Sequence, residues 1–349
     1  MKKIVVIGTA HIHAKKFLQT LKQRKDLKVI ALWDHDFNRR ERDANILETT
    51  AISNYNEILG NKELDAVIIC SETNLHEKII MDVTAAKKHL FVEKPIGFGR
   101  EDAKKMMHAI EESGVLFQTG YFMRSSAVNR KLKELISNKA FGKISRIQMN
   151  NCHDGIRRNI FSGYEWTTDL RQSGVGAFGD LGTHVLDLLL WFFQDLKAVL
   201  ATFESPLKTF EGCEETGVAL LKFHSGIIAT ISAGWVDVAQ PFVSIVSGTE
   251  GHAYTTKDEI YFKSIRNNNF DGQQPLTDLP DELPHAFDLF LDSISNNSKK
   301  NLISVREAAY NCSVIESMYK SNRLNEWVDV EEPPVRIPPK ESSEDVPTP

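Results

Sequence analysis

The sequence predicts two successive domains: an α/β domain with a parallel sheet, then an α+β domain built on a large, mostly antiparallel sheet. In the first part, short apolar runs alternate with amphipathic helical patterns, which is typical of βαβ units. Further along, apolar runs follow one another with only turns between them, which indicates antiparallel strands. With 349 residues, 42% of them hydrophobic, the chain is long enough for each domain to bury a core.

The first domain is expected over residues 1–122. Its predicted strands are residues 4–7, 29–33, 66–70, 90–92 and 116–119. The amphipathic stretches between them predict helices at residues 13–24, 75–88 and 100–113.

The second domain is expected over residues 123–330. Its predicted strands are residues 144–150, 198–203, 216–223, 227–233, 242–247 and 259–262. Helices are expected at residues 127–138, around 183–193, at 286–295 and at 305–321. Residues 331–349 hold six of the 12 prolines and are predicted to form an extended or disordered tail.

Composition excludes several classes of protein. Lys+Arg of 42 against Asp+Glu of 47 gives a net charge of −5, so no overall basic field attracts nucleic acid. The four cysteines are far apart and suggest neither a disulfide framework nor a zinc site. The first apolar stretch is too short for a signal peptide or a membrane span, so we expect a cytoplasmic protein without a membrane partner.

The most informative motif is Glu93-Lys94-Pro95, which follows a predicted buried strand. In an open α/β sheet, ligands bind beyond the carboxyl ends of the strands. A lysine at that edge can polarise a hydroxyl or carbonyl oxygen, because its ammonium is a compact charge. The alternative is an ion pair at the strand end with Lys94 solvated.

The segment Gly8-Thr-Ala-His-Ile-His13 lies between the first predicted strand and helix, where a dinucleotide-binding loop belongs. Only Gly8 keeps the glycine of such a loop, and Ala10 and His13 replace the other two. Asp34 ends the second strand, where a carboxylate can bind the adenosine ribose and repel a 2′-phosphate. A helix-capping role is the alternative for Asp34. Arg39 follows shortly after it and could reduce a preference for NAD over NADP.

The pair His11-x-His13 also has a rival interpretation. Such a pair can begin a metal-dependent hydrolase on a (β/α)₈ barrel, with Lys94 as a modified bridging ligand. Consecutive strands after residue 140 argue against a barrel, which needs eight βα units.

A second chemical signal is the spacing of Asp180, His184 and Asp187. At i, i+4 and i+7 these side chains share one face of a helix. A histidine within reach of a carboxylate can act as a general acid or base. An incidental Asp–His pair on a helix surface is the alternative.

Together these motifs resemble the Gfo/Idh/MocA family (glucose–fructose oxidoreductase, inositol dehydrogenase and relatives). The resemblance extends from the first strand to about Trp327. It is carried by Glu93-Lys94-Pro95, Asp180-x-Gly182-x-His184, Asp65-Ala-Val-Ile-Ile-Cys70, Asn74-x-His76, Gly120-Tyr-Phe-Met-Arg124, Gly248-Thr-Glu-Gly251 and Val305-Arg-Glu-Ala-Ala309.

The resemblance implies a Rossmann domain, a second domain on a mostly antiparallel sheet, and an active site between them. It implies that Lys94 holds the reacting oxygen, that His184 exchanges its proton, and that Asp180 binds substrate and orients His184. It also implies that the nicotinamide and its ribose are bordered by Asn74, His76 and Glu93. Pro95 is then expected to fix the turn, through a Lys94–Pro95 bond that could be cis.

The implied reaction transfers hydride between a secondary alcohol of a sugar or cyclitol, or its ketone, and NAD or NADP. Asp34 favours NAD. The chain departs from the family pattern at Ala10 and His13, and at Ser71-Glu72-Thr73, where the family often has proline. Ser71 is still expected to contact the cofactor, and Glu72 would further disfavour NADP.

Tyr121 and Arg124 at the domain junction are candidate substrate contacts, as are His153 and Arg157 in the following loop. An arginine there could pair with an acidic sugar or a phosphate, although a surface role is the alternative. The resemblance also implies a homodimer or homotetramer formed through the second sheet. The competing function is a dinucleotide-binding sensor or scaffold without turnover.

Overall fold

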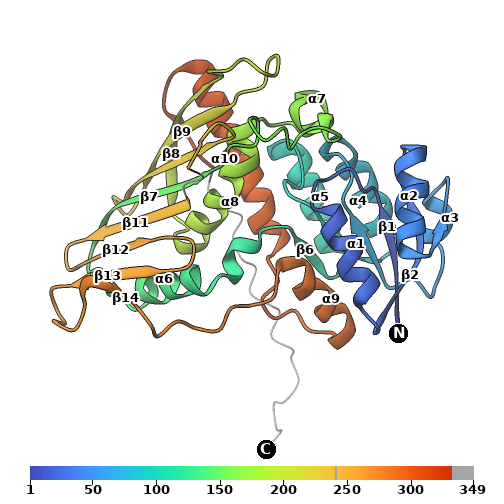
Figure 1. Cartoon of the computed structure of the whole chain (residues 1–349), viewed down its shortest axis with the longest axis horizontal. Helices are drawn as coiled ribbons and strands as arrows, with labels where there is room; N and C mark the ends of the chain where they lie inside the picture. Colours follow the sequence, from blue (N-terminus) through green and yellow to red (C-terminus); the bar gives the residue numbers. More distant parts are fainter. Residues whose placement is uncertain (240–241, 332–349) are drawn as a thin grey trace, which may run out of the picture.

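The computed structural model describes residues 1–239 and 242–331, and in them the two predicted types of sheet lie side by side (Figure 1). The tail expected at 331–349 lies outside the described residues except for Glu331. The fold class expected from the sequence is confirmed: a parallel Rossmann sheet is followed by a mostly antiparallel sheet.

Within the described residues the first sheet has six strands in the order β3-β2-β1-β4-β5-β6. All neighbouring pairs in it are parallel. The strands are short and apolar, and their central members are buried on both faces, as a parallel sheet covered by helices requires. Their bounds are β1 Lys2–Ile7, β2 Leu27–Trp33, β3 Thr50–Ala51, β4 Ala66–Ile69, β5 His89–Val92 and β6 Phe117–Thr119.

Helices connect these strands and cover both faces of the sheet (Figure 1). They are α1 Ala14–Gln23, α2 Phe37–Leu47, α3 Asn56–Leu59, α4 His76–Ala85 and α5 Arg100–Ser113, with the 3₁₀ turn η1 at Thr73–Leu75. Helix α1 shows why they pack: Ala14, Phe17, Leu18 and Leu21 form one buried stripe at helical spacing.

The register of this sheet aligns the residues that matter for function. Ile7 pairs with Trp33 and with Ile69, and Val92 pairs with Ile69 and Thr119. The residues that follow these strands, among them Gly8, Asp34 and Glu93, therefore gather along one carboxyl edge. In such folds, ligands bind at this edge.

The second sheet, within the described residues, has nine strands in the order β14-β13-β12-β11-β7-β10-β9-β8-β15. Only β7 and β10 pair in parallel among the described pairs, so the prediction of a mostly antiparallel sheet is confirmed. The strands are β7 Ile144–Cys152, β8 Leu196–Glu204, β9 Thr216–Phe223, β10 Ile228–Gly234, β11 Phe242–Gly248, β12 Gly251–Thr255, β13 Ile260–Ser264, β14 Asp271–Pro275 and β15 Val328–Asp329.

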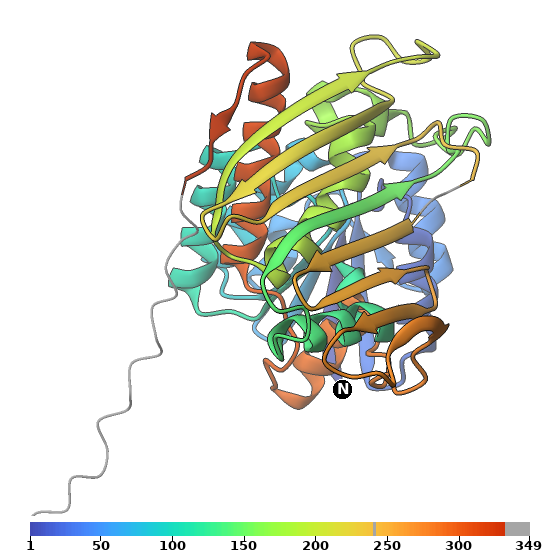
Figure 2. The same cartoon turned by 90° about the vertical axis from the view of Figure 1, so that its left-hand side faces the viewer.

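One face of this sheet is covered by helices, and the other is open toward the viewer in Figure 2. The covering elements lie between the two sheets (Figure 1). They are the turn η2 Phe122–Ser125, α6 Ala127–Ser137, α8 Ala177–Phe192 and α10 Val305–Leu324, with η3 Glu165–Thr168 and α7 Leu170–Ser173 preceding α8. The stretch Leu170–Phe192, which comprises α7 and α8, is apolar enough to span a membrane by length and composition, but an 18-residue window of it is 89% buried inside the protein.

Two helices near the end of the chain pack against the first domain. Phe287 and Phe290 of α9, which spans Ala286–Asn296, share a hydrophobic cluster with Phe91 of β5. The start of α10 packs in the same way, through Ala308 and Cys312. The chain thus returns to the Rossmann sheet after completing the second one, which fixes the two sheets relative to each other. The boundary expected at residue 122 stays a prediction.

Candidate active site

The motif Glu93-Lys94-Pro95 directly follows β5, at the carboxyl edge of the Rossmann sheet. The Lys94–Pro95 bond is cis, as the family resemblance suggested. The Lys94 backbone N–H donates to Glu93 Oε2 at 2.9 Å, and Lys94 is only 4% exposed. This places a buried ammonium where the strand ends.

The partner of Lys94 comes from the second domain. Lys94 Nζ lies 2.5 Å from Asp180 Oδ1, on the first turn of α8, and 3.2 Å from the Asp180 carbonyl oxygen. The indole N–H of Trp235 donates to Asp180 Oδ2 at 3.1 Å. Burial alone would raise the pKa of Asp180, but the Lys94 ammonium holds it below its usual range. An ionised carboxylate therefore bridges the two domains.

The amino end of α8 is held by Glu214, a glutamate that belongs to no motif recognised in the sequence. Glu214 Oε1 accepts from the Phe178 backbone N–H at 3.1 Å and from the Tyr319 hydroxyl. The same hydroxyl accepts from the Gly176 N–H at 3.0 Å. These contacts satisfy backbone N–H groups that the first turn of a helix leaves without partners. They stabilise a helix start at Ala177, earlier than the start expected around residue 183, and so hold Asp180 in place.

His184 lies one turn after Asp180 on α8 and is 4% exposed. Its ring is near Phe122 and Tyr121, with centroids 5.1 Å and 5.9 Å away. Burial, and after it the positive charge of Lys94, lower the pKa of His184 well below 6.5. Its Nδ1 is buried and has no hydrogen-bond partner among the described residues. A neutral imidazole with an unused nitrogen thus lies beside the Lys94–Asp180 pair.

The Gly8 loop approaches the same edge. Gly8 has φ +79°, and a Cβ there would lie 2.5 Å from Ser71 Cβ, so the tight turn after β1 requires glycine. Ala10 is buried, and its carbonyl oxygen accepts from the Trp166 indole N–H at 3.0 Å. Since Trp166 belongs to η3 of the second domain, that domain covers the loop expected to hold a pyrophosphate.

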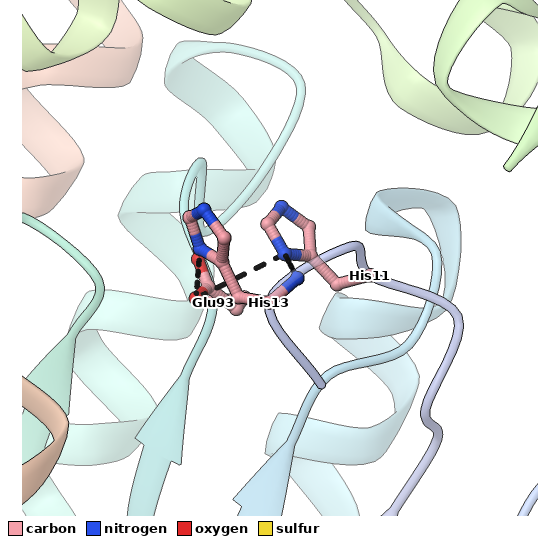
Figure 3. A group of neighbouring side chains, drawn as sticks. All are labelled: His11, His13 and Glu93. Carbon is pink, nitrogen blue, oxygen red and sulfur yellow. Dashed lines mark hydrogen bonds and ion pairs between the residues drawn. The ribbon is translucent and has the colours of Figure 1, made fainter. Parts of the chain in front are cut away.

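The two histidines of this loop meet Glu93 (Figure 3). His13 Nδ1 lies 3.0 Å from Glu93 Oε1, and His11 Nδ1 lies 3.9 Å from the same oxygen. Burial lowers the pKa of His11 to about 3, so its ring is neutral. Burial also opposes ionisation of Glu93, but the hydrogen bond from His13 and the charge of Lys94 hold its pKa well below 4.5.

Asp34 is fully buried at the end of β2, and its carboxylate already has protein partners. Arg39 binds both of its oxygens, with two N–O distances of 2.7 Å, and the Thr9 N–H donates to Oδ2 at 2.8 Å. Arg39 also donates to Glu72 Oε1 at 2.9 Å. Two carboxylates therefore surround one guanidinium, where the sequence suggested a free ribose-binding aspartate.

The remaining candidates for the cofactor side lie near this edge. His76 Nδ1 donates to the Pro95 carbonyl oxygen at 3.1 Å, and its Nε2 is buried without a partner among the described residues. Burial lowers the pKa of His76. Asn74 is exposed on η1. Three features fit a dinucleotide: the Gly8 turn, the sheet edge at Asp34 and the unused His76 nitrogen. His13 differs, since its side chain contacts Glu93 where the expected loop has a glycine.

The candidates for the substrate side divide into two groups. His153 follows β7, and burial lowers its pKa, while the charge of Asp180 acts in the opposite direction. Arg157 is exposed on the following loop. Tyr121 and Arg124 instead have internal partners: the Tyr121 hydroxyl contacts Thr183 Oγ1 at 2.9 Å, and Arg124 binds both oxygens of Asp187, at 2.8 Å and 2.6 Å.

Arg124 also donates to Glu307 Oε1 at 2.7 Å, so its guanidinium links η2 to α8 and α10. Asp187 is thus bound by Arg124. Asp180 and His184 are the other two polar residues of this helix face, and they lie toward Lys94. One site residue had no signal in the sequence: His285 stacks on Phe122 at 5.3 Å, next to His184. Burial, then Lys16, lower the pKa of His285 to about 4.

Comparisons with known proteins agree with this architecture. Residues 2–121 match the model of the oxidoreductase family with an NAD-binding Rossmann fold, GFO_IDH_MocA, and residues 129–254 match its C-terminal domain. Among relatives, 1,5-anhydro-D-fructose reductase of Ensifer adhaerens is 27% identical over 232 residues, which is 65% of this chain and 68% of that protein.

Myo-inositol 2-dehydrogenase of Thermotoga maritima is 28% identical over 231 residues, 64% of each chain. Among solved structures, the WlbA dehydrogenase of Chromobacterium violaceum, in complex with NADH and UDP-GlcNAcA, superposes with a TM-score of 0.80. It is 18% identical, with 95% of this chain and 96% of that chain covered, so the likeness concerns the fold. The chain belongs to the Gfo/Idh/MocA family of NAD-binding oxidoreductases.

Proposed function

We propose that this protein transfers hydride between NAD and a carbon that bears a secondary hydroxyl in a sugar or cyclitol, or the corresponding ketone. One observation carries the proposal: Lys94 Nζ of one domain lies 2.5 Å from Asp180 Oδ1 of the other, with His184 one turn further along α8. An ammonium, a carboxylate and a neutral imidazole are the groups needed to hold and deprotonate a hydroxyl group.

In this proposal Lys94 donates a hydrogen bond to the reacting oxygen and stabilises the negative charge that grows on it. Such stabilisation is worth on the order of 3 kcal/mol. His184 takes the hydroxyl proton during oxidation and returns it during reduction. Asp180 orients Lys94 and remains ionised, since Lys94 keeps the pKa of this carboxyl low. Trp235 in turn holds the free carboxylate oxygen at 3.1 Å.

The cofactor would be held by the Gly8 turn, by Ala10 and His11, by the edge at Ser71 and Asn74, and by His76 and Glu93. The chemistry that a nicotinamide supplies when bound is the acceptance or donation of hydride. Asp34 and Glu72 surround Arg39 with two carboxylates, which opposes a 2′-phosphate and supports NAD over NADP.

The names of the relatives support a carbohydrate or cyclitol substrate: one reduces 1,5-anhydro-D-fructose, another acts on myo-inositol, and a third is in complex with UDP-GlcNAcA. His153 and the exposed Arg157 are the proposed contacts for the rest of the substrate. Arg124, which is bound by Asp187 and Glu307, contributes by holding α8 in place.

We also propose a homodimer or homotetramer that covers the open face of the second sheet (Figure 2). Val218, Leu220 and Ile228 are exposed there, at 44%, 37% and 50%. Adjacent apolar side chains of this size on one sheet face favour a protein partner. Sedimentation of the purified protein tests this, with a monomer as the contrary result.

A dinucleotide-binding sensor without turnover is the second candidate. It is favoured by His13, which replaces a glycine of the expected loop and contacts Glu93. Thermal shift with NAD, NADH, NADP and NADPH, followed by absorbance of the reduced nicotinamide with a polyol panel, separates the candidates. A dehydrogenase shows a shift and turnover, a sensor shows a shift alone, and the absence of any shift rejects both.

A further inference from the structure

The loop after β1 and the end of β5 bring together three side chains that commonly bind metal ions. One ring nitrogen of His11, one of His13 and one carboxylate oxygen of Glu93 all lie within 4.8 Å of one another. Figure 3 shows the two rings next to each other, with the Glu93 carboxylate close to the His13 ring. Glu93 is fully buried and His11 is 5% exposed, while His13 closes the group from the more exposed side, with 34% of its side chain accessible.

The hydrogen bonds of this group are few and replaceable. His11 Nδ1 accepts only a 3.2 Å bond from the His13 backbone N–H among the described residues, and His13 Nδ1 contacts Glu93 Oε1 at 3.0 Å. A metal ion between the three atoms would replace both contacts. The Lys94 ammonium opposes a second cation nearby, but Asp180 neutralises it at 2.5 Å.

We propose that His11, His13 and Glu93 form a binding site for a divalent transition-metal ion, with Zn²⁺ as the best fit. Two imidazoles and one carboxylate are a ligand set that Zn²⁺ accepts with positions left open, whereas Mg²⁺ and Ca²⁺ prefer oxygen ligands alone. His11 and Glu93 of this group also border the dinucleotide in the proposed function. On that basis the metal ion and the dinucleotide exclude each other.

Isothermal titration of the full chain with Zn²⁺ tests the site without dinucleotide or turnover. We expect one ion per chain, and at least tenfold weaker binding in His13→Ala. The matched control is His108→Ala, which removes an exposed histidine of α5 and should bind as the original protein does. Equal binding by His13→Ala and the original protein overturns the site, as does an equal loss in His108→Ala.

Cobalt(II) gives a second readout that needs no variant. A visible ligand-field spectrum that saturates at one equivalent, and that Zn²⁺ removes, supports the site, and titration without such a spectrum overturns it. NADH is then titrated with and without Zn²⁺. If Zn²⁺ does not bind but NADH does, the metal site is wrong and the proposed function stands. If Zn²⁺ binds but no dinucleotide does, the metal site stands and the proposed function is wrong.

Discussion

Lys94 Nζ and Asp180 Oδ1 lie 2.5 Å apart, although the two residues belong to different domains and are separated by 86 positions in the sequence. The pair joins the end of β5 to the first turn of α8. It therefore brings the basic group of the Rossmann edge next to α8, the helix that carries His184, the proposed acid and base.

Breaking the pair should destabilise the fold. Lys94→Met leaves the Asp180 carboxylate without its cation, and removal of one partner of a buried pair costs about 3 kcal/mol or more. Because 30% of the Asp180 side chain is exposed, we expect about 2 kcal/mol here, measured by urea unfolding. The double variant Lys94→Met/Asp180→Asn should recover at least half of the loss. A double variant less stable than the single one would contradict the pairing.

The pH dependence of turnover should identify His184 as the base. Burial and Lys94 lower the pKa of His184 well below 6.5, so the imidazole is neutral across the physiological range. Alcohol oxidation needs this neutral form, so kcat/KM should stay level through pH 6.5 and fall only at more acidic pH. Ketone reduction needs the protonated form, so its rate should fall as pH rises from that pKa. An acid limb centred at or above pH 6.5 would argue against His184 as the base.

Selectivity between NADH and NADPH tests the group around Arg39. Because Asp34 and Glu72 both surround this guanidinium, a 2′-phosphate meets an excess negative charge. Fluorescence titration should give NADH an affinity at least about tenfold higher, which corresponds to about 1.4 kcal/mol. Glu72→Gln should reduce the preference, and the exposed control Glu57→Gln should leave it unchanged. Equal or tighter binding of NADPH to the original protein would be the contrary finding.

Trp166 should affect cofactor binding more than chemistry. Its indole N–H donates to the Ala10 carbonyl oxygen at 3.0 Å across the domain junction. Trp166→Phe keeps a ring but removes this bond, so KM for NAD should rise about two- to tenfold with kcat unchanged. Trp327→Phe, at a partly exposed position, serves as the control. A fall in kcat at constant KM would show instead that Trp166 affects the hydride-transfer step.

Much of this arrangement followed from local patterns. The apolar run before Glu93 placed Lys94 at a strand end, and the spacing of Asp180 and His184 placed both on one helix face. Parallel strands share an edge, so the meeting of the Gly8 loop with Glu93 was also predictable. These inferences needed only short stretches of sequence and the rules of sheet topology.

Other contacts were beyond such patterns because their partners are distant in the chain. Arg124 pairs with Asp187 and Glu307, which are 63 and 183 positions away, so its internal role had no local signal. Trp235 binds Asp180 across 55 positions. His285 reaches Phe122 only because α9 returns to the Rossmann sheet.

Hydride transfer itself can be measured by following reduced nicotinamide after mixing the protein with NAD and a panel of sugars, sugar acids and cyclitols. We predict that the original protein forms reduced nicotinamide with at least one of them. His184→Gln should be slower by roughly 10²- to 10⁴-fold while keeping its thermal shift with NADH. If NADH binds but no panel member is oxidised, or if His184→Gln reacts at the original rate, the proposed chemistry is contradicted.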